Sequence, residues 1–201
     1  LLELGVDANV GSPLYFASLN GNMKLVEALI EFRANVNIGC IDFGPNPIHA
    51  ACESGNLEIF ERLIQMAAQF NGLVRTSTSE ADEDNDDDYY NATALHFACM
   101  GGNLRIVEIL VNLGSDVNAM WMDEFDIHDA VSPFHIACHK GFTEIVDFLA
   151  GRVDDIDHQS RYDKLPPLYF AFKAGHLKVI QSLLKHGADP RIPSWHGRST
   201  L

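Results

Sequence analysis

Three histidine–cysteine pairs have the residue types and the spacing that a metal site or a catalytic site could use. A cysteine follows each histidine after three residues, in the pairs His49 and Cys52, His96 and Cys99, and His135 and Cys138. Residues i and i+3 share one face of a helix, so each pair could offer zinc a nitrogen and a sulfur ligand. Zinc needs all its ligands within about 2.3 Å of one point. Because the same pair recurs along the chain, a repeated structural role is the alternative to a metal site.

Other chemistry has no support in the sequence. The chain contains no nucleophile elbow, phosphate-binding Gly-rich loop, dinucleotide fingerprint or kinase motif. The carboxylates lie in one loop run or on polar helix faces, so paired-carboxylate catalysis has no special support. We therefore predict that this chain is not itself an enzyme and needs no cofactor and no metal.

A unit of helix, tight turn and helix recurs along the chain. The turn glycines are Gly21, Gly55, Gly102, Gly141 and Gly175, at steps of 34, 47, 39 and 34 residues. A short run such as Thr93–Cys99 precedes each glycine, and an amphipathic run such as Ile106–Val111 follows it. Glycine permits the left-handed turn that folds the second helix back on the first. One such unit cannot bury its apolar face alone, so neighbouring units must stack.

The helix starts have recognisable signals. The residue ahead of the first helix can accept a hydrogen bond from a free backbone N–H, and proline suits the next position. The predicted N-caps are Ser12, Asn46, Thr93 and Ser132.

The repeated unit resembles the ankyrin repeat, through runs such as Ser132-Pro133-Phe134-His135 and endings such as Gly114-Ser115-Asp116-Val117-Asn118. The resemblance implies an all-α fold, an ankyrin-repeat solenoid of stacked helix-turn-helix units with hairpin loops. We expect residues 1–201 to form a single array that belongs to a larger multidomain chain, because Leu1 lies in the middle of a repeat. The expected segments are a preceding tail (1–10), repeats (11–38, 39–71, 91–120, 131–165, 166–192), an acidic insertion (72–90), a loop insertion (121–130) and the start of a further repeat (193–201).

Some positions depart from the ankyrin pattern. Arg33, Ala67 and Val153 replace the glycine that ends the second helix. A residue with a side chain there either takes a left-handed conformation or forces the turn onto another path. The link from Asn9 to Pro13 is too short for a normal hairpin.

The resemblance also bears on the histidines and cysteines. It implies that the repeated histidine hydrogen-bonds the backbone of the neighbouring loop. Stacked helices lie about 10 Å apart, so equivalent pairs in two repeats cannot share one zinc ion. We predict that Cys52, Cys99 and Cys138 are small core residues.

Two loops interrupt the period. The run Glu80–Asp88 holds seven acids in nine residues, and such a block repels itself and lacks an apolar anchor. It is either a solvated insertion without a function or a binding site for a basic partner. Ser77 and Ser79 match the phosphorylation sites of an acid-directed kinase. The second loop carries Trp121, Met122 and Phe125, which either cap the local core or anchor a partner.

Composition and resemblance together point to a protein-binding function. The chain has 28 acidic and 14 basic residues, which argues against a general nucleic-acid binder, and its apolar stretches are too short for membrane insertion. The resemblance implies that hairpin tips and first helices form a concave face that binds a protein or peptide segment, here one with apolar and acidic side chains. The expected partner-binding residues are Phe43, Glu53, Met100, Trp121, Met122, Phe125, His139, Lys140, Arg161, Tyr162, Lys173 and Trp195.

Two other functions remain open. The repeats could be the targeting or regulatory segment of a larger enzyme, such as a kinase or ubiquitin ligase, or of a channel. Alternatively, the acidic insertion could bind basic proteins such as histones. Charge is uneven, since residues 158–201 contain seven basic and two acidic residues. We expect a cytoplasmic location, with a nuclear one as the alternative.

Overall fold

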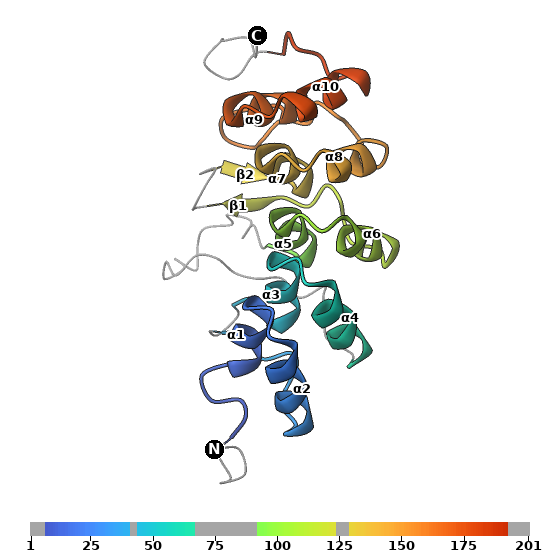
Figure 1. Ribbon diagram of the computed structural model, residues 1–201. Helices are drawn as coiled ribbons and strands as arrows, with labels where there is room; N and C mark the ends of the chain where they lie inside the picture. The colour runs from blue at the N-terminus through green and yellow to red at the C-terminus, as the bar shows by residue number, and fades with distance from the viewer. Residues whose placement is uncertain (1–6, 41–43, 67–91, 124–128, 193–201) are drawn as a thin grey trace, which may run out of the picture. The chain divides into compact units, whose positions relative to one another are not determined.

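The computed structural model describes residues 7–40, 44–66, 92–123 and 129–192, and in these ranges the helices follow one another in pairs (Figure 1). A first helix of seven or eight residues is joined by a tight turn to a second of eight or nine. The pairs are α1 (Pro13–Leu19) with α2 (Met23–Glu31), α3 (Pro47–Glu53) with α4 (Leu57–Gln65), α5 (Ala94–Gly101) with α6 (Leu104–Asn112), α7 (Pro133–Lys140) with α8 (Thr143–Ala150), and α9 (Pro167–Ala174) with α10 (Leu177–Lys185).

The turn inside each pair is left-handed, as the sequence predicts. The turn glycines have φ angles of 65°, 64°, 77°, 83° and 78° at Gly21, Gly55, Gly102, Gly141 and Gly175. A side chain is disfavoured in this conformation. The five glycines therefore set the direction in which each second helix returns.

Three of the four predicted N-caps are confirmed. Asn46 accepts hydrogen bonds from the backbone of Ile48 and His49. Thr93 and Ser132 occupy the N-cap position with extended backbone. Ser12 does not cap α1, because its φ of 52° is left-handed and its hydroxyl instead donates to the Gly39 carbonyl at 2.7 Å.

The second helices have caps that the sequence interpretation missed. Asn22, Asn56 and Asn103 follow the turn glycine, and each side-chain oxygen accepts a backbone N–H from the first turn of α2, α4 or α6. The repeated Gly-Asn dipeptide was the available signal, since asparagine is a preferred N-cap. In these three repeats one dipeptide thus ends the turn and begins the next helix.

The described residues fall into two compact units. The first contains α1–α6 (from residues 1–72 and 93–116), and the second contains β1, β2 and α7–α10 (from residues 73–92 and 117–201). In the first unit α1, α3 and α5 pack side by side, and α2, α4 and α6 form a second layer against them (Figure 1). Fully buried apolar side chains fill the space between the layers, namely Val26, Ile59, Phe60, Leu63, Ile106, Val107 and Leu110.

The second unit has the same helix pairing and adds a small hairpin. Helix α7 packs against α9, and α8 against α10. Strands β1 (Trp121–Asp123) and β2 (Asp129–Val131) pair antiparallel, with Trp121 opposite Val131 and Asp123 opposite Asp129. The segment expected as a loop insertion at 121–130 therefore contributes residues to two paired strands, and β2 leads into α7.

The residues that depart from the ankyrin pattern differ in their backbone conformation. Arg33 adopts the left-handed conformation with a φ of 60°. Val153 does not, and the backbone N–H groups of Arg152 and Val153 both donate to the Leu149 carbonyl. Ala67 lies outside the described residues. The short link between Asn9 and Pro13 is made by two left-handed residues in succession, Gly11 and Ser12.

Candidate functional site

The repeated histidines are buried at the start of their helices. His49, His96 and His135 are at most 1% exposed. The Nδ1 atom of each accepts the backbone N–H three residues earlier, from Asn46, Thr93 and Ser132, at 3.2, 3.1 and 3.2 Å. The imidazole thus ties the lead-in loop to its own helix. The further bond to a neighbouring loop, which the resemblance implies, stays a prediction.

Burial also fixes the protonation state of one of these rings. Desolvation, assisted by the nearby His158, lowers the pKa of His135 from 6.5 to about 4. A neutral ring with Nδ1 as an acceptor is the form that the hydrogen bond requires. The His135 ring is therefore uncharged at neutral pH.

The cysteines that share the helix face with these histidines are core residues, as predicted. Cys52, Cys99 and Cys138 are 0% exposed and reduced. Burial raises the pKa of the Cys52 and Cys99 thiols well above the usual range, and zinc binds thiolates rather than thiols. Within the described residues, no three His, Cys, Asp or Glu side chains are grouped in a way that could hold a metal ion.

A buried carboxylate organises a loop in the second unit. Asp129, at the start of β2, is 0% exposed. Its Oδ1 accepts the N–H groups of Ala130 and Tyr162 at 2.7 and 3.0 Å, and its Oδ2 accepts the N–H of Asp163 at 3.2 Å and the Ser160 hydroxyl. A carboxylate that accepts several hydrogen bonds can remain buried without a cationic partner.

The loop that Asp129 holds spans residues 160–165, which we name the tip loop. It is closed by hydrogen bonds from Ser160 N to the Leu165 carbonyl (2.9 Å) and from Leu165 N to the Ser160 hydroxyl (3.0 Å). Arg161 N donates to the Ala130 carbonyl at 3.1 Å. The backbone of the tip loop is thus fixed from inside, while its four central side chains are exposed, those of Arg161, Tyr162, Asp163 and Lys164.

The expected partner-binding residues occupy different environments. Tyr162 is 49% exposed, and Arg161 and Lys173 are exposed as well. Half-buried positions hold Glu53, Met100, His139 and Lys140. Glu53 and Met100 belong to the first unit, and the other five residues belong to the second. Phe43, Phe125 and Trp195 lie outside the described residues, as does the Met122 side chain.

Trp121 requires a correction. An exposed tip position was expected for it, but its side chain is only 2% exposed. Its partner in the strand ladder is Val131, which is also buried. Of the two alternatives for this loop, Trp121 therefore follows the one in which the residue caps the local core. Asp129 and Ser160, which shape the tip loop, were not identified from the sequence, because nothing in their local pattern distinguishes a buried carboxylate from an exposed one.

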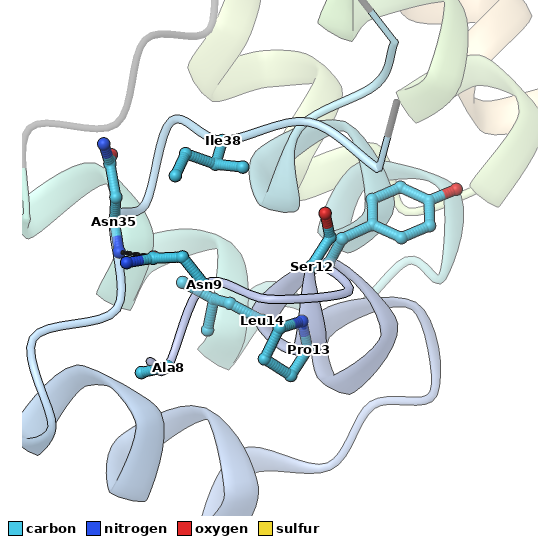
Figure 2. Close-up of a pocket in the computed structure, with 8 residues that line it drawn as sticks. Ala8, Asn9, Ser12, Pro13, Leu14, Asn35 and Ile38 are labelled. Atoms are coloured by element: carbon cyan, nitrogen blue, oxygen red, sulfur yellow. Dashed lines mark hydrogen bonds between the residues drawn. The ribbon is translucent and has the colours of Figure 1, made fainter. Parts of the chain in front are cut away.

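A shallow pocket lies where the first unit departs from a normal hairpin. It holds about 170 Å³, including space open to solvent, and Asn9 and Asn35 meet across it (Figure 2). The Asn35 N–H donates to Asn9 Oδ1 at 2.7 Å. The remaining lining residues are Ala8, Ser12, Pro13, Leu14, Tyr15 and Ile38. Small-molecule sites usually measure about 300–1,000 Å³, so this pocket does not support a small-molecule function.

Tyr15 takes the place of the repeated histidine in the first repeat. Desolvation, with contributions from Cys40 and Glu53, raises the pKa of its phenol to about 12. The hydroxyl is therefore protonated at neutral pH and serves as a neutral polar group beside Cys40.

The acidic run Glu80–Asp88, with Ser77 and Ser79, lies outside the described residues. Among the helices that are described, none has the length and apolar character that crossing a bilayer requires.

The chain was compared with protein families and with curated proteins. The family model "Ankyrin repeats (3 copies)" matches residues 1–72 and 121–194, and the model "Ankyrin repeat" matches residues 90–121. The chain is similar to Palmitoyltransferase AKR1 from Kluyveromyces lactis (32% identity over 79 residues) and from Lachancea kluyveri (30% over 78 residues). Each alignment covers 39% of this chain, and only 10% and 11% of those proteins, respectively. The family matches extend over most of the sequence and agree with the helix pairs of the structure, and the chain therefore belongs to the ankyrin-repeat family.

Proposed function

We propose that this chain binds a segment of a partner protein on the concave face that ankyrin repeats form from their first helices and hairpin tips. Ankyrin repeats are in general protein-interaction modules. The observation that carries the proposal is the tip loop, whose backbone is fixed by the buried Asp129 while Arg161 and Tyr162 remain exposed. Tyrosine and arginine are enriched among the residues that dominate binding energy, and a loop ordered in advance loses less entropy on binding.

Basic side chains of the tip loop and of α7 and α9 favour a ligand with acidic and apolar side chains. Arg161 and Lys164 lie on either side of Tyr162 in the tip loop. Helix α7 ends with Lys140, and the last turn of α9 contains Lys173. Complementary charge raises the association rate and fixes register. Tyr162 supplies apolar contact area beside Arg161 and Lys164, so an extended acidic peptide with one large apolar side chain fits this proposal.

The test is a paired affinity capture from cell extract with identification of partners by mass spectrometry. The baits are the natural chain and the double variant Arg161→Ala/Tyr162→Ala, after circular dichroism shows that both are folded. The matched control is Arg105→Ala, which removes an exposed arginine from α6 in the first unit. Trp121 is left unchanged, because replacing a buried tryptophan would disturb the fold.

We expect the double variant to lose a partner that the control retains. Peptides from that partner should then bind the natural chain at least about tenfold more tightly than the double variant, a difference of about 1.4 kcal/mol. Identical partner sets for all three baits would reject the tip loop as the binding surface.

A second candidate is that the repeats form the regulatory or targeting segment of a larger enzyme. The two similar proteins favour it, because both are named palmitoyltransferases and the aligned region is about a tenth of each. An antibody raised against this chain tests the proposal on an immunoblot of source cells. A band far above 22.3 kDa would support a larger parent protein, and a band near that mass would contradict it.

A further inference from the structure

An exposed apolar row follows the ends of the second helices in the first unit. Phe32, Met66 and Leu113 are the C-cap residues of α2, α4 and α6, and they are 43%, 40% and 47% exposed. Each lies eleven residues after its turn glycine, so the three hold one position of successive repeats. We name them the C-cap row. Single exposed apolar residues are ordinary on a protein surface, whereas a group of them marks a contact surface.

The stacking of repeats does not use the C-cap row. Met66 and Leu113 stay exposed although a preceding repeat packs against their helices. Buried residues one turn earlier, such as Leu63 and Leu110, make the contact with the first helices. The equivalent position in the second unit is polar, since Arg152 occupies it after α8. The apolar side chains of the row are therefore available for a contact outside the fold.

Carboxylates lie between the members of the C-cap row. Glu27 of α2 reaches Arg62 of α4 at 2.8 Å, and Arg62 precedes Met66 by four residues. Residues four apart are neighbours on a helix surface, so Glu27 lies on the side of α2 that faces Met66. Glu61 holds the same repeat position in α4 and is exposed, so it lies on the side toward Leu113.

The helix ends at the row add to the negative potential. A helix C-terminus carries about half a negative charge, which a nearby cation stabilises. In the second unit Arg152 supplies that cation, because its guanidinium donates to the Phe148 carbonyl of α8 at 2.6 Å. The last turns of α2 and α6 contain no basic residue, and Arg62 of α4 is already paired. Arg33 follows the end of α2, but Glu31 in the last turn offsets its charge. The row therefore favours a positively charged ligand.

The interval of the row matches one regular structure especially well. Packed neighbouring helices lie about 8–10 Å apart, and so do the members of the row. Seven residues of an α-helix rise about 10.5 Å and return to the same face. An extended strand presents one face at intervals of about 6.6 or 13 Å, which do not fit. A polyproline II segment repeats at about 9.3 Å, but such ligands dock on aromatic rings, which Met66 and Leu113 lack.

We infer that the C-cap row binds an amphipathic helix of a partner protein, with apolar side chains seven residues apart and lysine or arginine beside them. Three such apolar side chains contact Phe32, Met66 and Leu113 in turn. The basic side chains lie near Glu31, Glu61 and the helix ends. The row belongs to the first unit and the tip loop to the second, so this inference does not depend on the proposed function.

A synthetic helical peptide tests the inference. It carries three leucines at a spacing of seven residues, lysines beside the leucine stripe, and alanine elsewhere. One control peptide has the same composition with the leucines four residues apart, on one helix face but only about 6 Å from each other. A second has the same charge and a proline-rich backbone with leucine at every third position.

Fluorescence anisotropy with the 201-residue chain gives the affinities. We expect the peptide with the seven-residue spacing to bind at least about tenfold more tightly than either control. The equal charge of the controls is essential, because a chain with a net charge of −14 attracts any lysine-rich peptide.

Variants of the chain locate the binding surface. Met66→Gln/Leu113→Gln should weaken binding at least about tenfold, after circular dichroism shows that it is folded. The matched control is Val10→Gln, because Val10 is 73% exposed in the first unit and lies outside the row. This control and Arg161→Ala/Tyr162→Ala should bind the peptide like the natural chain, so a failure of the tip loop and a failure of the row are distinguishable.

Three results would overturn the inference. If the three peptides bind equally, charge alone explains the binding. If Met66→Gln/Leu113→Gln binds the peptide like the natural chain, the row is not the surface. Sedimentation velocity gives the third, since both proteins should sediment alike. A self-association of the natural chain that this double variant abolishes would show that a second copy covers the row instead of a partner helix.

Discussion

The carboxylate of Asp129 shows how one side chain can shape a loop more than thirty residues away in sequence. Its oxygens accept N–H groups from both Tyr162 and Asp163 and the hydroxyl of Ser160. The repeated histidines act over a shorter range, since each Nδ1 holds the backbone just ahead of its own helix. In both cases a buried polar group replaces water as the partner of loop N–H groups.

Asp129→Asn should loosen the tip loop without unfolding the chain. An amide keeps the shape but offers one acceptor oxygen where the carboxylate offers two, so at least one N–H loses its bond. We expect a loss of roughly 1–3 kcal/mol of stability and faster amide hydrogen exchange at Tyr162 and Asp163. Asp163→Asn, on an exposed side chain, is the control. Unchanged exchange at both amides would show that Asp129 does not hold the loop.

His135 should make stability depend on pH below neutrality. Its pKa is 6.5 ordinarily and about 4 in the fold. The unfolded chain therefore binds a proton in the window between these values, whereas the folded chain does not, and stability falls as the pH drops from 6.5 to 4. The contribution reaches roughly 3 kcal/mol.

Urea unfolding at pH 7, 6, 5 and 4.5 measures this effect. Carboxylates also titrate near the lower end of the window, so the comparison is with His135→Gln, which has no titrating ring. The variant should be less stable at pH 7 and should lose less stability on acidification. If the free energy of unfolding falls equally with decreasing pH in the two proteins, the prediction is contradicted.

At the scale of elements, the close approach of first helices is the feature that most restricts substitution. Gly101 ends α5, and a Cβ atom there would lie 2.1 Å from the Cys52 carbonyl oxygen and 2.7 Å from that of Glu53. The acceptor atoms belong to the backbone of α3 and cannot move aside cheaply. Helix α5 therefore lies against α3 with no room for a methyl group.

Gly101→Ala should destabilise the chain although alanine favours helices. Propensity alone predicts a gain of about 0.5–1 kcal/mol, but the backbone clash should outweigh it and give a net loss of roughly 1–3 kcal/mol. Gly151→Ala is the matched control, because its Cβ would meet nothing within 4 Å and its φ is −87°. The midpoint of thermal unfolding should fall for Gly101→Ala and should rise or stay unchanged for Gly151→Ala. An unchanged midpoint for Gly101→Ala would contradict the close packing of α5 against α3.

The sequence predicts the elements well because their signals are local and repeated. Three features each recur at a fixed position of successive repeats, so that each copy supports the others. They are the turn glycines, the buried cysteines and the caps at Asn46, Thr93 and Ser132. Ser12 and Trp121 depart from the prediction because contacts distant in sequence decide them, with the Gly39 carbonyl in one case and the paired strand in the other. Asp129 could not be found for the same reason, since its partners lie 31 to 34 residues away.

At the scale of the whole molecule, the uneven charge is the dominant feature. The net charge is −14, and the run Glu80–Asp88 contributes seven of the acids. Residues 158–201 carry the opposite sign, with seven basic and two acidic residues. Self-repulsion in a chain of high net charge opposes the compact state, and salt screens that repulsion.

Added salt should therefore stabilise the folded chain. We expect the midpoint of thermal unfolding to rise by roughly 2–5 °C between about 10 and about 150 mM NaCl. A variant that lacks residues 80–88 should respond less, since it has half the net charge. A midpoint that falls with salt would show that attractive ion pairs, such as Arg62 with Glu27, outweigh the repulsion.

The four cysteines differ sharply in accessibility, which has a practical consequence for labelling. Cys40 is half-buried, whereas Cys52, Cys99 and Cys138 are sealed inside the repeats as protonated or fully covered thiols. A maleimide dye should therefore attach to the folded chain at Cys40 first, without any engineered residue. The other three thiols become reactive only when the helices around them separate. The labelling rate of each thiol therefore reports how often that region of the array opens.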